Sequence, residues 1–167
     1  MGANFLDEPM RIRRAKVDEA EAIRCLVLDA VRPHKGEDFS EEGWCTFKES
    51  NSLPRIVERL QSPDYLSFVC ESDDKLVGII IIKDDTKIDQ LFVDPAFRRR
   101  GIAKALWNEA RQICDSPSGT SEYWVNSSTI GVSMYESFGF LPAGSKQIKN
   151  GIIFFPMFLS VQSEVKK

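Results

Sequence analysis

Three apolar segments between Tyr65 and Val93 constrain the fold of this chain more than any other feature. They cover residues 65–70, 76–82 and 87–93, are rich in β-branched and aromatic residues, and are separated by only a few residues each. Asp73–Asp74–Lys75 and Lys83–Asp84–Asp85 have the composition of tight turns, which join antiparallel neighbours. The sequence therefore predicts a central antiparallel arrangement of three consecutive strands.

The flanking segments predict helices and further strands. Apolar residues recur at helical spacing after Asp18, which we expect to cap that helix, and Pro33 ends it. Further helices are expected over 53–60, 99–114 and 129–138, and further strands over 10–13, 122–125, from 140 onward and over 151–159. This order predicts an α+β fold with a central mixed, mostly antiparallel β-sheet flanked by about four helices. Residues 34–52 show no clear period, so we expect irregular structure there.

Length and composition fit a single domain over residues 1–167, with loose ends at 1–9 and 161–167. The net charge of −3 argues against a nucleic-acid partner. The longest apolar run, over 77–82, is far shorter than the ~20 residues that span a bilayer, so no membrane segment is expected.

The cysteines and the single histidine also limit the possible chemistry. The sequence has no C-x-x-C pair, and its possible metal ligands of these two types are widely separated: Cys25, Cys45, Cys70, Cys114 and His34. No metal site is therefore expected. We see no signal peptide, which predicts reduced thiols and a cytoplasmic protein.

The segment from Leu91 to Lys104 carries the clearest functional pattern. A strand ending at Val93 turns through residues 94–97 and opens a helix at three arginines and a glycine. The first amides of a helix have no partner within it and carry the positive end of its dipole, so they attract phosphate groups. Three cations at this end are unfavourable by ~0.3–1 kcal/mol each unless an anion lies nearby. The pattern therefore predicts a diphosphate-binding site.

Here the sequence resembles the GNAT N-acetyltransferase superfamily. The family signature Q/R-x-x-G-x-G/A is met by Arg98, Gly101 and Ala103, which follow the predicted strand Leu91–Val93. A second family motif, Y-x-x-x-G-F, is met by residues 135–140. The order of predicted elements also fits, so the resemblance covers nearly the whole chain.

The resemblance implies acetyl-CoA as cosubstrate, no metal, and a sheet splayed between the strands 91–93 and 122–125. The pantetheine arm would lie in this gap, and backbone groups of the first strand would pair with it and polarise the thioester. Amides of residues 99–104 would hold the pyrophosphate. The cofactor-binding residues implied in this way are Leu91, Phe92, Val93, Arg98, Arg99, Arg100, Gly101, Ile102, Ala103, Lys104 and Asn126.

Direct acyl transfer needs a proton donor for the departing thiolate and a base for the ammonium of the acceptor. By the resemblance, the general acid is the tyrosine of the second motif, Tyr135. Our choice of base is Asp89, because in a regular strand it shares a face with Leu91 and Val93 and points toward the acyl end of the gap. A solvated carboxylate on the outer face of the sheet is the alternative for Asp89.

Residues 34–52, which show no clear hydrophobic period, could contact the acceptor. Phe39, Trp44 and Phe47 could line a substrate pocket, or they could form an auxiliary core under this segment. The acidic residues nearby, which favour a cationic amine, are Asp38, Glu41, Glu42 and Glu49.

Three hypotheses follow for the function. The first is acetyl transfer to a primary amine of a small molecule or peptide, by a monomer or homodimer. The second is acetylation of protein lysines or N-termini, which needs residues 34–52 to form an open groove, whereas a closed pocket favours small molecules. The third is a sensor or interaction module that binds CoA and is catalytically weak.

Overall fold

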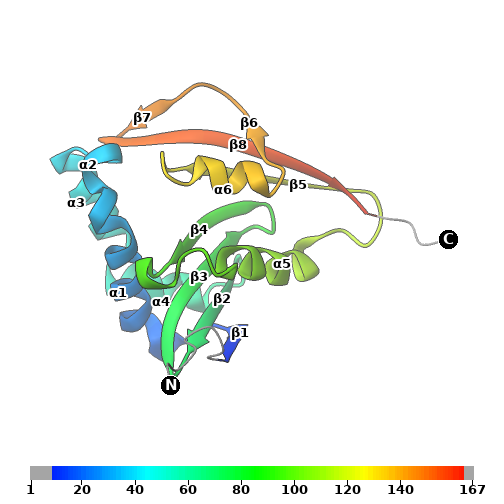
Figure 1. The fold of residues 1–167 in the computed structure, drawn as a ribbon, viewed down its shortest axis with the longest axis horizontal. Coiled ribbons are helices and arrows are strands. Elements are labelled where there is room, and N and C mark those ends of the chain that lie inside the picture. The colour runs from blue at the N-terminus through cyan, green and yellow to red at the C-terminus, as the bar shows by residue number, and fades with distance from the viewer. Residues whose placement is uncertain (1–8, 164–167) are drawn as a thin grey trace, which may run out of the picture.

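One sheet organises residues 9–163, the part of the chain that the computed structural model describes (Figure 1). Its strand order is β1-β2-β3-β4-β5-β8-β6, and β7 pairs with β8 off this path. All the pairings are antiparallel except that of β4 with β5, so the predicted mixed, mostly antiparallel sheet is confirmed. The strands are β1 (Met10–Arg14), β2 (Tyr65–Ser72), β3 (Lys75–Lys83), β4 (Lys87–Val93), β5 (Thr120–Ser127), β6 (Leu141–Pro142), β7 (Gln147–Lys149) and β8 (Ile152–Gln162).

Helices connect these strands. Four of the described helices lie between β1 and β2, one between β4 and β5, and one between β5 and β6. They are α1 (Ala20–Val31), α2 (Lys35–Asp38), α3 (Glu41–Ser50), α4 (Leu53–Gln61), α5 (Ile102–Cys114) and α6 (Val132–Ser137). Short 3₁₀ turns cover Val17–Glu19, Arg32–His34 and Pro95–Phe97.

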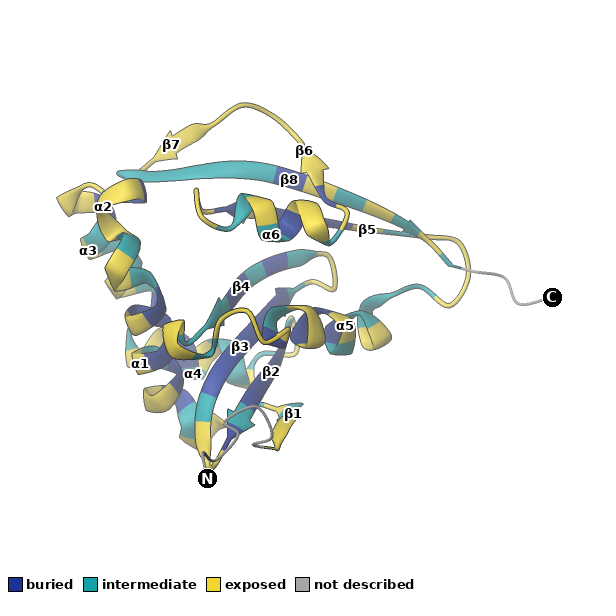
Figure 2. Cartoon of the chain, in the orientation of Figure 1, coloured by how far each residue is buried: buried dark blue, intermediate teal, exposed yellow. Residues whose placement is uncertain are grey.

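The apolar run of β3 is explained by burial on both faces of the sheet. Ile80 and Ile82 belong to the core cluster that contains α5, while Ile79 and Ile81 belong to the cluster that contains α1 and α4. All four side chains are fully buried, as the dark colour along β3 in Figure 2 shows. A strand covered by helices on both sides has no need for alternating polar residues.

The two predicted hairpins are confirmed. β2 pairs antiparallel with β3, and β3 with β4. Both turns are made by aspartates in the left-handed region, with φ of 50° and 61° at Asp73 and Asp74, and of 52° and 58° at Asp84 and Asp85. Aspartate tolerates this conformation better than most residues because its short side chain can hydrogen-bond locally.

Residues 34–52 are helical, so the expectation of irregular structure was wrong. They form α2 and α3, and Ser40 caps α3 by accepting a hydrogen bond from the Gly43 N–H at 3.1 Å. The ordering comes from contacts with a distant segment: the Ser40 N–H donates to the Gly151 carbonyl at 2.9 Å. The fold therefore has more helical segments than the sequence predicted.

Several element boundaries also differ from prediction. Glu19, rather than Asp18, accepts the hydrogen bond from the Lys16 N–H before α1, at 2.9 Å. The helix expected from residue 99 begins at Ile102. β8 extends to Gln162, so residues 161–162, which we expected to be loose, belong to a strand. Of the other residues in the expected loose ends, Pro9 and Ser163 are described, and residues 1–8 and 164–167 lie outside the described part of the chain.

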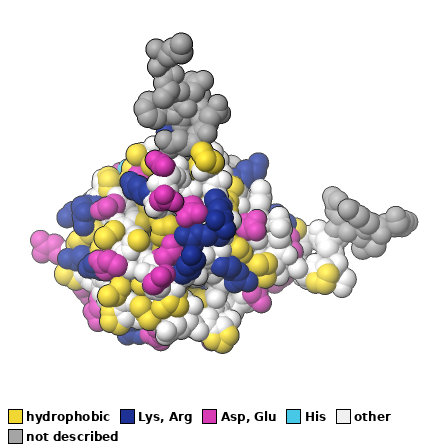
Figure 3. All heavy atoms as spheres, turned by 90° about the horizontal axis from the view of Figure 1, so that it is seen from below, with side chains coloured by type: hydrophobic (Ala, Val, Ile, Leu, Met, Phe, Trp, Pro, Cys, Tyr) yellow, Lys and Arg dark blue, Asp and Glu magenta, His cyan; other side chains and the backbone are white. Residues whose placement is uncertain are grey.

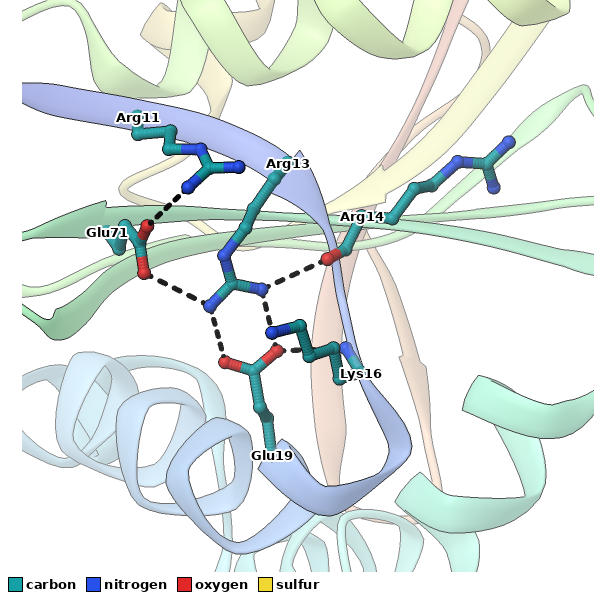
Figure 4. Close-up of polar contacts among 6 residues, drawn as sticks. All are labelled: Arg11, Arg13, Arg14, Lys16, Glu19 and Glu71. Carbon is teal, nitrogen blue, oxygen red and sulfur yellow. Dashed lines mark hydrogen bonds and ion pairs between the residues drawn. The ribbon is translucent and has the colours of Figure 1, made fainter.

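A polar cluster joins β1, β2 and the start of α1. Arg13 donates to Glu19 at 2.7 and 2.8 Å and to Glu71 at 3.1 Å (Figure 4). The hydrogen bond from Arg13 lowers the pKa of Glu19, which therefore stays ionised in the folded chain. On the face of the molecule seen in Figure 3, basic and acidic side chains likewise lie beside one another.

Candidate active site

The sheet opens between β4 and β5. These parallel strands pair only at Lys87 with Trp124 and at Ile88 with Val125. Beyond that point β4 keeps β3 on one side and has no strand on the other, so alternate N–H and C=O groups of its edge are left unpaired by the sheet. The expected splay at Leu91–Val93 is confirmed. On β5, however, the separation begins after Val125 rather than within 122–125.

A cavity of about 670 Å³ occupies this opening. That volume is within the range of small-molecule sites, ~300–1,000 Å³. Of the residues predicted for the site, those that line the cavity are Phe39, Phe47, Asp89, Leu91, Phe92, Val93, Arg98, Arg99, Gly101, Ile102, Ala103, Lys104, Asn126 and Tyr135. Arg100 and Trp44 do not line it.

The loop before α5 forms one end of the cavity. Arg99 and Gly101 both have left-handed backbone, with φ of 65° and 76°, and α5 begins at the next residue, Ile102. A left-handed arginine is strained, and such strain is typical of loops that serve a site. A Cβ placed on Gly101 would meet no atom within 4 Å, so the space beside the helix amides is open. A phosphate group can therefore reach the free N–H groups.

The four basic residues of this loop have different surroundings. Arg99 and Lys104 line the cavity, and within residues 9–163 neither makes an ion pair or a side-chain hydrogen bond. Arg100 lies over the Phe97 ring at 4.9 Å, outside the cavity lining, which does not support its predicted contact with the cofactor.

Arg98 anchors the loop to the end of α1. Its guanidinium donates to the Ala30 carbonyl at 3.0 Å and lies 3.2 Å from His34 Nε2. A cation placed against the last carbonyls of a helix is favourable because of the helix dipole. Arg98 therefore already has protein partners, whereas Arg99 and Lys104 are left for an anion.

Tyr135 of α6 is buried in the cavity wall. It is 6% exposed, and its ring packs edge-on against Phe138 and Phe140. Burial raises the pKa of its phenol above the ordinary tyrosine value. Asn126, at the end of β5, is exposed and lines the same cavity.

The premise for placing Asp89 was wrong. Ile82 pairs with Ile88 while Ile81 pairs with Gln90, so Asp89 is the extra residue of a β-bulge. The bulge shifts the alternation of β4, and the Asp89 carboxylate forms an ion pair with Arg59 of α4 at 3.5 Å. Asp89 lines the cavity, but it does not share a face with Leu91 and Val93 as a regular strand would require.

The opposite end of the cavity is closed by contacts between segments far apart in the sequence. Phe39 bridges to Ile152, and a Cβ on Gly43 would lie 2.0 Å from the Gly151 carbonyl oxygen. The buried carboxylate of Asp38 accepts hydrogen bonds from the Thr129 N–H and hydroxyl. The α2–α3 corner is thereby fixed to the β7–β8 turn and to the loop before α6.

Aromatic side chains from three segments meet at this closed end. The ring centroids of Phe39 and Phe47 are 5.2 Å apart, and those of Phe47 and Phe92 are 6.3 Å apart. Trp44 stacks on Phe47 with ring centroids 5.8 Å apart and does not line the cavity. Phe39 and Phe47 thus line the cavity, whereas Trp44 packs against both rings without lining it, and contact of these residues with a substrate stays a prediction.

A buried amide pair, Asn51 and Gln90, was missed by sequence reasoning. Gln90 Nε2 donates to Asn51 Oδ1, and Asn51 Nδ2 donates to the Phe47 carbonyl at 3.0 Å. Gln90 lines the cavity and is 6% exposed, and within residues 9–163 its Oε1 has no hydrogen-bond partner. The two residues are 39 positions apart, so no local pattern could have indicated the pair.

The remaining reactive groups lie elsewhere. Burial raises the pKa of the Cys70 thiol, and burial raises that of Cys114 to about 12, which disfavours the nucleophilic thiolate. Among residues 9–163, no three His, Cys, Asp or Glu side chains gather as metal ligands would. No helix in that range is long and apolar enough to cross a membrane.

This geometry defines a class of protein. The sheet opens between two parallel strands. Free helix amides and unpaired cations lie at one end of the opening, and a buried tyrosine lies in its wall. This arrangement suits a transferase that takes an acyl thioester of CoA.

Comparison with known proteins identifies the family. Residues 35–161, most of the chain, match the family model described as the acetyltransferase (GNAT) domain. The chain therefore belongs to this family of N-acetyltransferases, which act with CoA, and the family resemblance is confirmed. A comparison with curated protein sequences found no match.

Solved structures of the same fold include three similar proteins. PaiA N-acetyltransferase from Thermoplasma acidophilum, solved in complex with coenzyme A, has a TM-score of 0.74 and 21% identity over 90% of this chain and 98% of its own. A GCN5-related N-acetyltransferase from Rhodopseudomonas palustris has a TM-score of 0.78 and 17% identity, covering 96% and 100%. The ribosomal-protein-S18-alanine N-acetyltransferase from Escherichia coli has a TM-score of 0.62 and 17% identity, covering 95% and 97%.

Proposed function

We propose that this N-acetyltransferase transfers the acetyl group of acetyl-CoA directly to a primary amine of a small molecule or short peptide. The observation that carries the proposal is the single cavity that joins the phosphate-accepting loop, the open edge of β4 and Tyr135, and that is closed at its far end by the α2–α3 corner. A donor and an acceptor that share one cavity can react without a covalent enzyme intermediate.

The residues present fit acetyl-CoA. The amides at the start of α5, together with Arg99 and Lys104, suit the pyrophosphate, because a charged partner strengthens each hydrogen bond to an anion. The unpaired edge of β4 at Leu91–Val93 suits the amide groups of the pantetheine arm, and Asn126 lies across the gap from it. We propose these contacts for the cosubstrate.

Tyr135 is the proposed proton donor. Acetyl-CoA supplies an activated acyl group, and the overall reaction turns a protonated amine and acetyl-CoA into the N-acetyl amine, the CoA thiol and one proton. Like any tyrosine, Tyr135 is protonated at neutral pH, and burial raises its pKa further, so it can give its proton to the departing sulfur. The proton lost by the attacking nitrogen restores the phenol.

Asp89 remains the proposed base, acting through water. Its carboxylate is held by Arg59, and Asp38, the other carboxylate of the lining, is engaged by Thr129. Because the Asp89 side chain is 21% exposed whereas Asp38 is only 2% exposed, Asp89 is the carboxylate better placed to relay the first proton of the ammonium toward solvent.

The closed far end favours a small acceptor over a folded protein. Residues 34–52 form packed helices instead of an open groove, and their docking onto Gly151 narrows access from that side. The name of the Escherichia coli neighbour describes an alanine of a ribosomal protein as its acceptor, but a likeness in fold does not transfer that acceptor to this chain. We further propose that the chain works in the cytoplasm as a single domain, monomeric or dimeric.

The test is acetyl transfer to three kinds of acceptor. Acetyl-CoA is mixed with the protein and with small primary amines, a tetrapeptide, or a folded lysine-rich protein. CoA release is followed by chromatography, because the exposed Cys25 and Cys45 would themselves react with thiol reagents. We expect turnover with small amines or the tetrapeptide, and no acetyl group on the enzyme by intact mass. Turnover on the folded protein alone would overturn the proposal.

A further inference from the structure

The basic and acidic side chains of the cavity lining come from different elements. The cations Arg98, Arg99 and Lys104 belong to the loop before α5 and to the first turn of that helix. The carboxylates Asp38 and Asp89 belong to α2 and β4. Bound acetyl-CoA would bring its phosphates to the cations, so the charge that an acceptor meets in the rest of the cavity is set by the two carboxylates.

The two carboxylates have different partners. Asp89 forms an ion pair with Arg59 at 3.5 Å, so a positive charge already lies beside it. Asp38 accepts hydrogen bonds from the Thr129 N–H, at 3.1 Å, and from the Thr129 hydroxyl, and both of these donors are neutral. Within residues 9–163, Asp38 makes no ion pair. Asp38 is therefore the carboxylate of the lining whose charge no cation balances.

The charge of Asp38 lies in a wall that is otherwise apolar. The residue is buried, and Phe39 and Phe47, whose ring centroids are 5.2 Å apart, line the same end of the cavity. An asparagine could accept hydrogen bonds from the same N–H and hydroxyl, so fixing the α2–α3 corner does not require a charge. A buried charge without a counter-charge is costly, and a cation that enters the cavity would offset that cost.

The lysines of α2 and α3 do not supply this counter-charge. Lys35 Nζ and Lys48 Nζ lie over the Trp44 ring, 5.5 and 5.9 Å from its centroid, and neither lysine lines the cavity. An ammonium group can also contact the faces of aromatic rings, so the phenylalanines at this end do not exclude one. The counter-charge for Asp38 is therefore expected from a bound molecule.

From these observations we infer that the acceptor carries a second positive charge besides the amine that is acetylated, and that Asp38 selects for it. The inference rests on the proposed function and narrows its substrate class to small diamines and related amines with a further cationic group. The second cation would lie at the closed end, where the corner after α2 meets β8 (Figure 1). The reacting amine would lie at the opening between β4 and β5, where it loses its proton.

The first test compares straight-chain amines in matched pairs. Butylamine, hexylamine and octylamine are assayed beside the α,ω-diamines of equal carbon number, and CoA release is followed by chromatography. We expect kcat/KM for at least one diamine to exceed that for its matched monoamine by about tenfold or more, the worth of a hydrogen bond to a buried charge.

Two results would contradict the inference in different ways. If no diamine exceeds its monoamine beyond the statistical advantage of two equivalent amines, the inference is overturned and the proposed function stands. If none of these amines supports CoA release, the inference is again overturned, and failure of the tetrapeptide as well would overturn the proposed function.

The second test separates charge recognition from a structural role of Asp38. Asp38→Asn removes the charge and keeps an acceptor for Thr129, so we expect kcat/KM for the preferred diamine to fall by about tenfold while that for the monoamine changes little. Glu42→Gln is the matched control, because it removes a charge from an exposed position of α3 outside the cavity lining. Both rates should stay within about twofold of wild type in this control.

Acetyl-CoA affinity and thermal unfolding, measured alongside, should stay near wild type in Asp38→Asn and so show that it folds. An equal loss of kcat/KM for the diamine and the monoamine would show that Asp38 only holds the α2–α3 corner. That result, or an unchanged preference for the diamine, would overturn the inference.

Discussion

The two ends of the cavity are built in different ways. The end at residues 98–104, which form the loop before α5 and its first turn, comes from one continuous stretch of chain, in which a strand, a turn and a helix N-terminus follow one another. The closed end is assembled from α2, α3, β4 and the β7–β8 turn, and its contacts join residues more than a hundred positions apart, such as Ser40 and Gly151. Local backbone geometry thus defines the end proposed to bind the cofactor, and tertiary packing defines the end proposed to bind the acceptor; these are the cofactor end and the acceptor end.

The two ends of the cavity should therefore respond differently to substitution. The cofactor end relies on backbone amides and on charge, which tolerate changes in neighbouring side chains. The acceptor end depends on individual side chains and on close backbone contact at Gly43 and Gly151. Changes at the two ends should therefore affect different kinetic constants.

Tyr135→Phe should give the largest effect. Tyr135 lies in the wall of the cavity and is the proposed proton donor, so removing its hydroxyl should lower kcat by on the order of 10²–10⁴. Acetyl-CoA affinity should stay unchanged in calorimetry. Tyr123→Phe is the matched control, because it removes another phenol hydroxyl from a buried ring outside the cavity lining. A kcat near wild type, or a change confined to acetyl-CoA affinity, would break the assignment.

Gly43→Ala should damage the acceptor end alone. The added Cβ would lie 2.0 Å from the Gly151 carbonyl oxygen, so the α2–α3 corner must move away from the β7–β8 turn. We expect a loss of about 1–3 kcal/mol in the free energy of unfolding and a rise of about tenfold in amine KM. Thermal unfolding and steady-state kinetics measure both.

Gly36→Ala is the control for that change, since its Cβ would meet no atom within 4 Å. Its stability and KM should remain near wild type. A rise in acetyl-CoA Kd in Gly43→Ala equal to the rise in amine KM would show that the two ends are not independent.

Arg99→Ala and Lys104→Ala should affect the cofactor end alone. Each removes an unpaired cation from the cavity lining, so each should weaken acetyl-CoA binding by about threefold to tenfold and leave amine KM unchanged. Arg100→Ala, which removes a cation held over Phe97, should have little effect on binding. Calorimetric titration measures the acetyl-CoA affinity of the three variants. An equal loss of affinity in all three would contradict the distinction between the two unpaired cations and Arg100.

The pH profile should show the smallest effect. Burial raises the pKa of Tyr135, and a phenol with a raised pKa keeps its proton as the pH rises through the ordinary tyrosine value of about 10. The profile of kcat should therefore show no fall due to Tyr135 below about pH 10, and the stability linked to this group is likewise lost only above that pH. A falling limb below pH 10 that is absent in Tyr135→Phe would contradict the raised pKa of Tyr135.

Local chemistry made the central strands and the cofactor loop predictable. The Asp73–Asp74 turn and the apolar run of β3 leave few alternatives to an antiparallel hairpin. The strand–turn–helix pattern around Gly101 is contained in consecutive residues. The cap of α3 was also visible, because Ser40 precedes two acidic residues of a first helical turn. By itself this cap did not predict a helix, because α3 lacks a long apolar stripe.

The acceptor end could not be predicted in the same way. The bulge at Asp89 is visible only in the pairing of β4 with β3, and it reverses the face that simple alternation assigns to this carboxylate. The Asn51–Gln90 pair joins residues 39 positions apart, and Arg98, which precedes the left-handed Arg99, is anchored to the Ala30 carbonyl of α1. Each of these features is set by contacts between elements.

The most direct test of the account is to map acetyl-CoA binding on the backbone amides by NMR. At 18.9 kDa the chain is suited to residue-by-residue assignment. The account predicts that the amides of Leu91–Val93, Arg99–Lys104 and Asn126 shift on titration, while those of β1 and α4 do not. Shifts concentrated on β1 and α4, or no shift at saturating acetyl-CoA, would contradict the placement of the cosubstrate in the gap between β4 and β5.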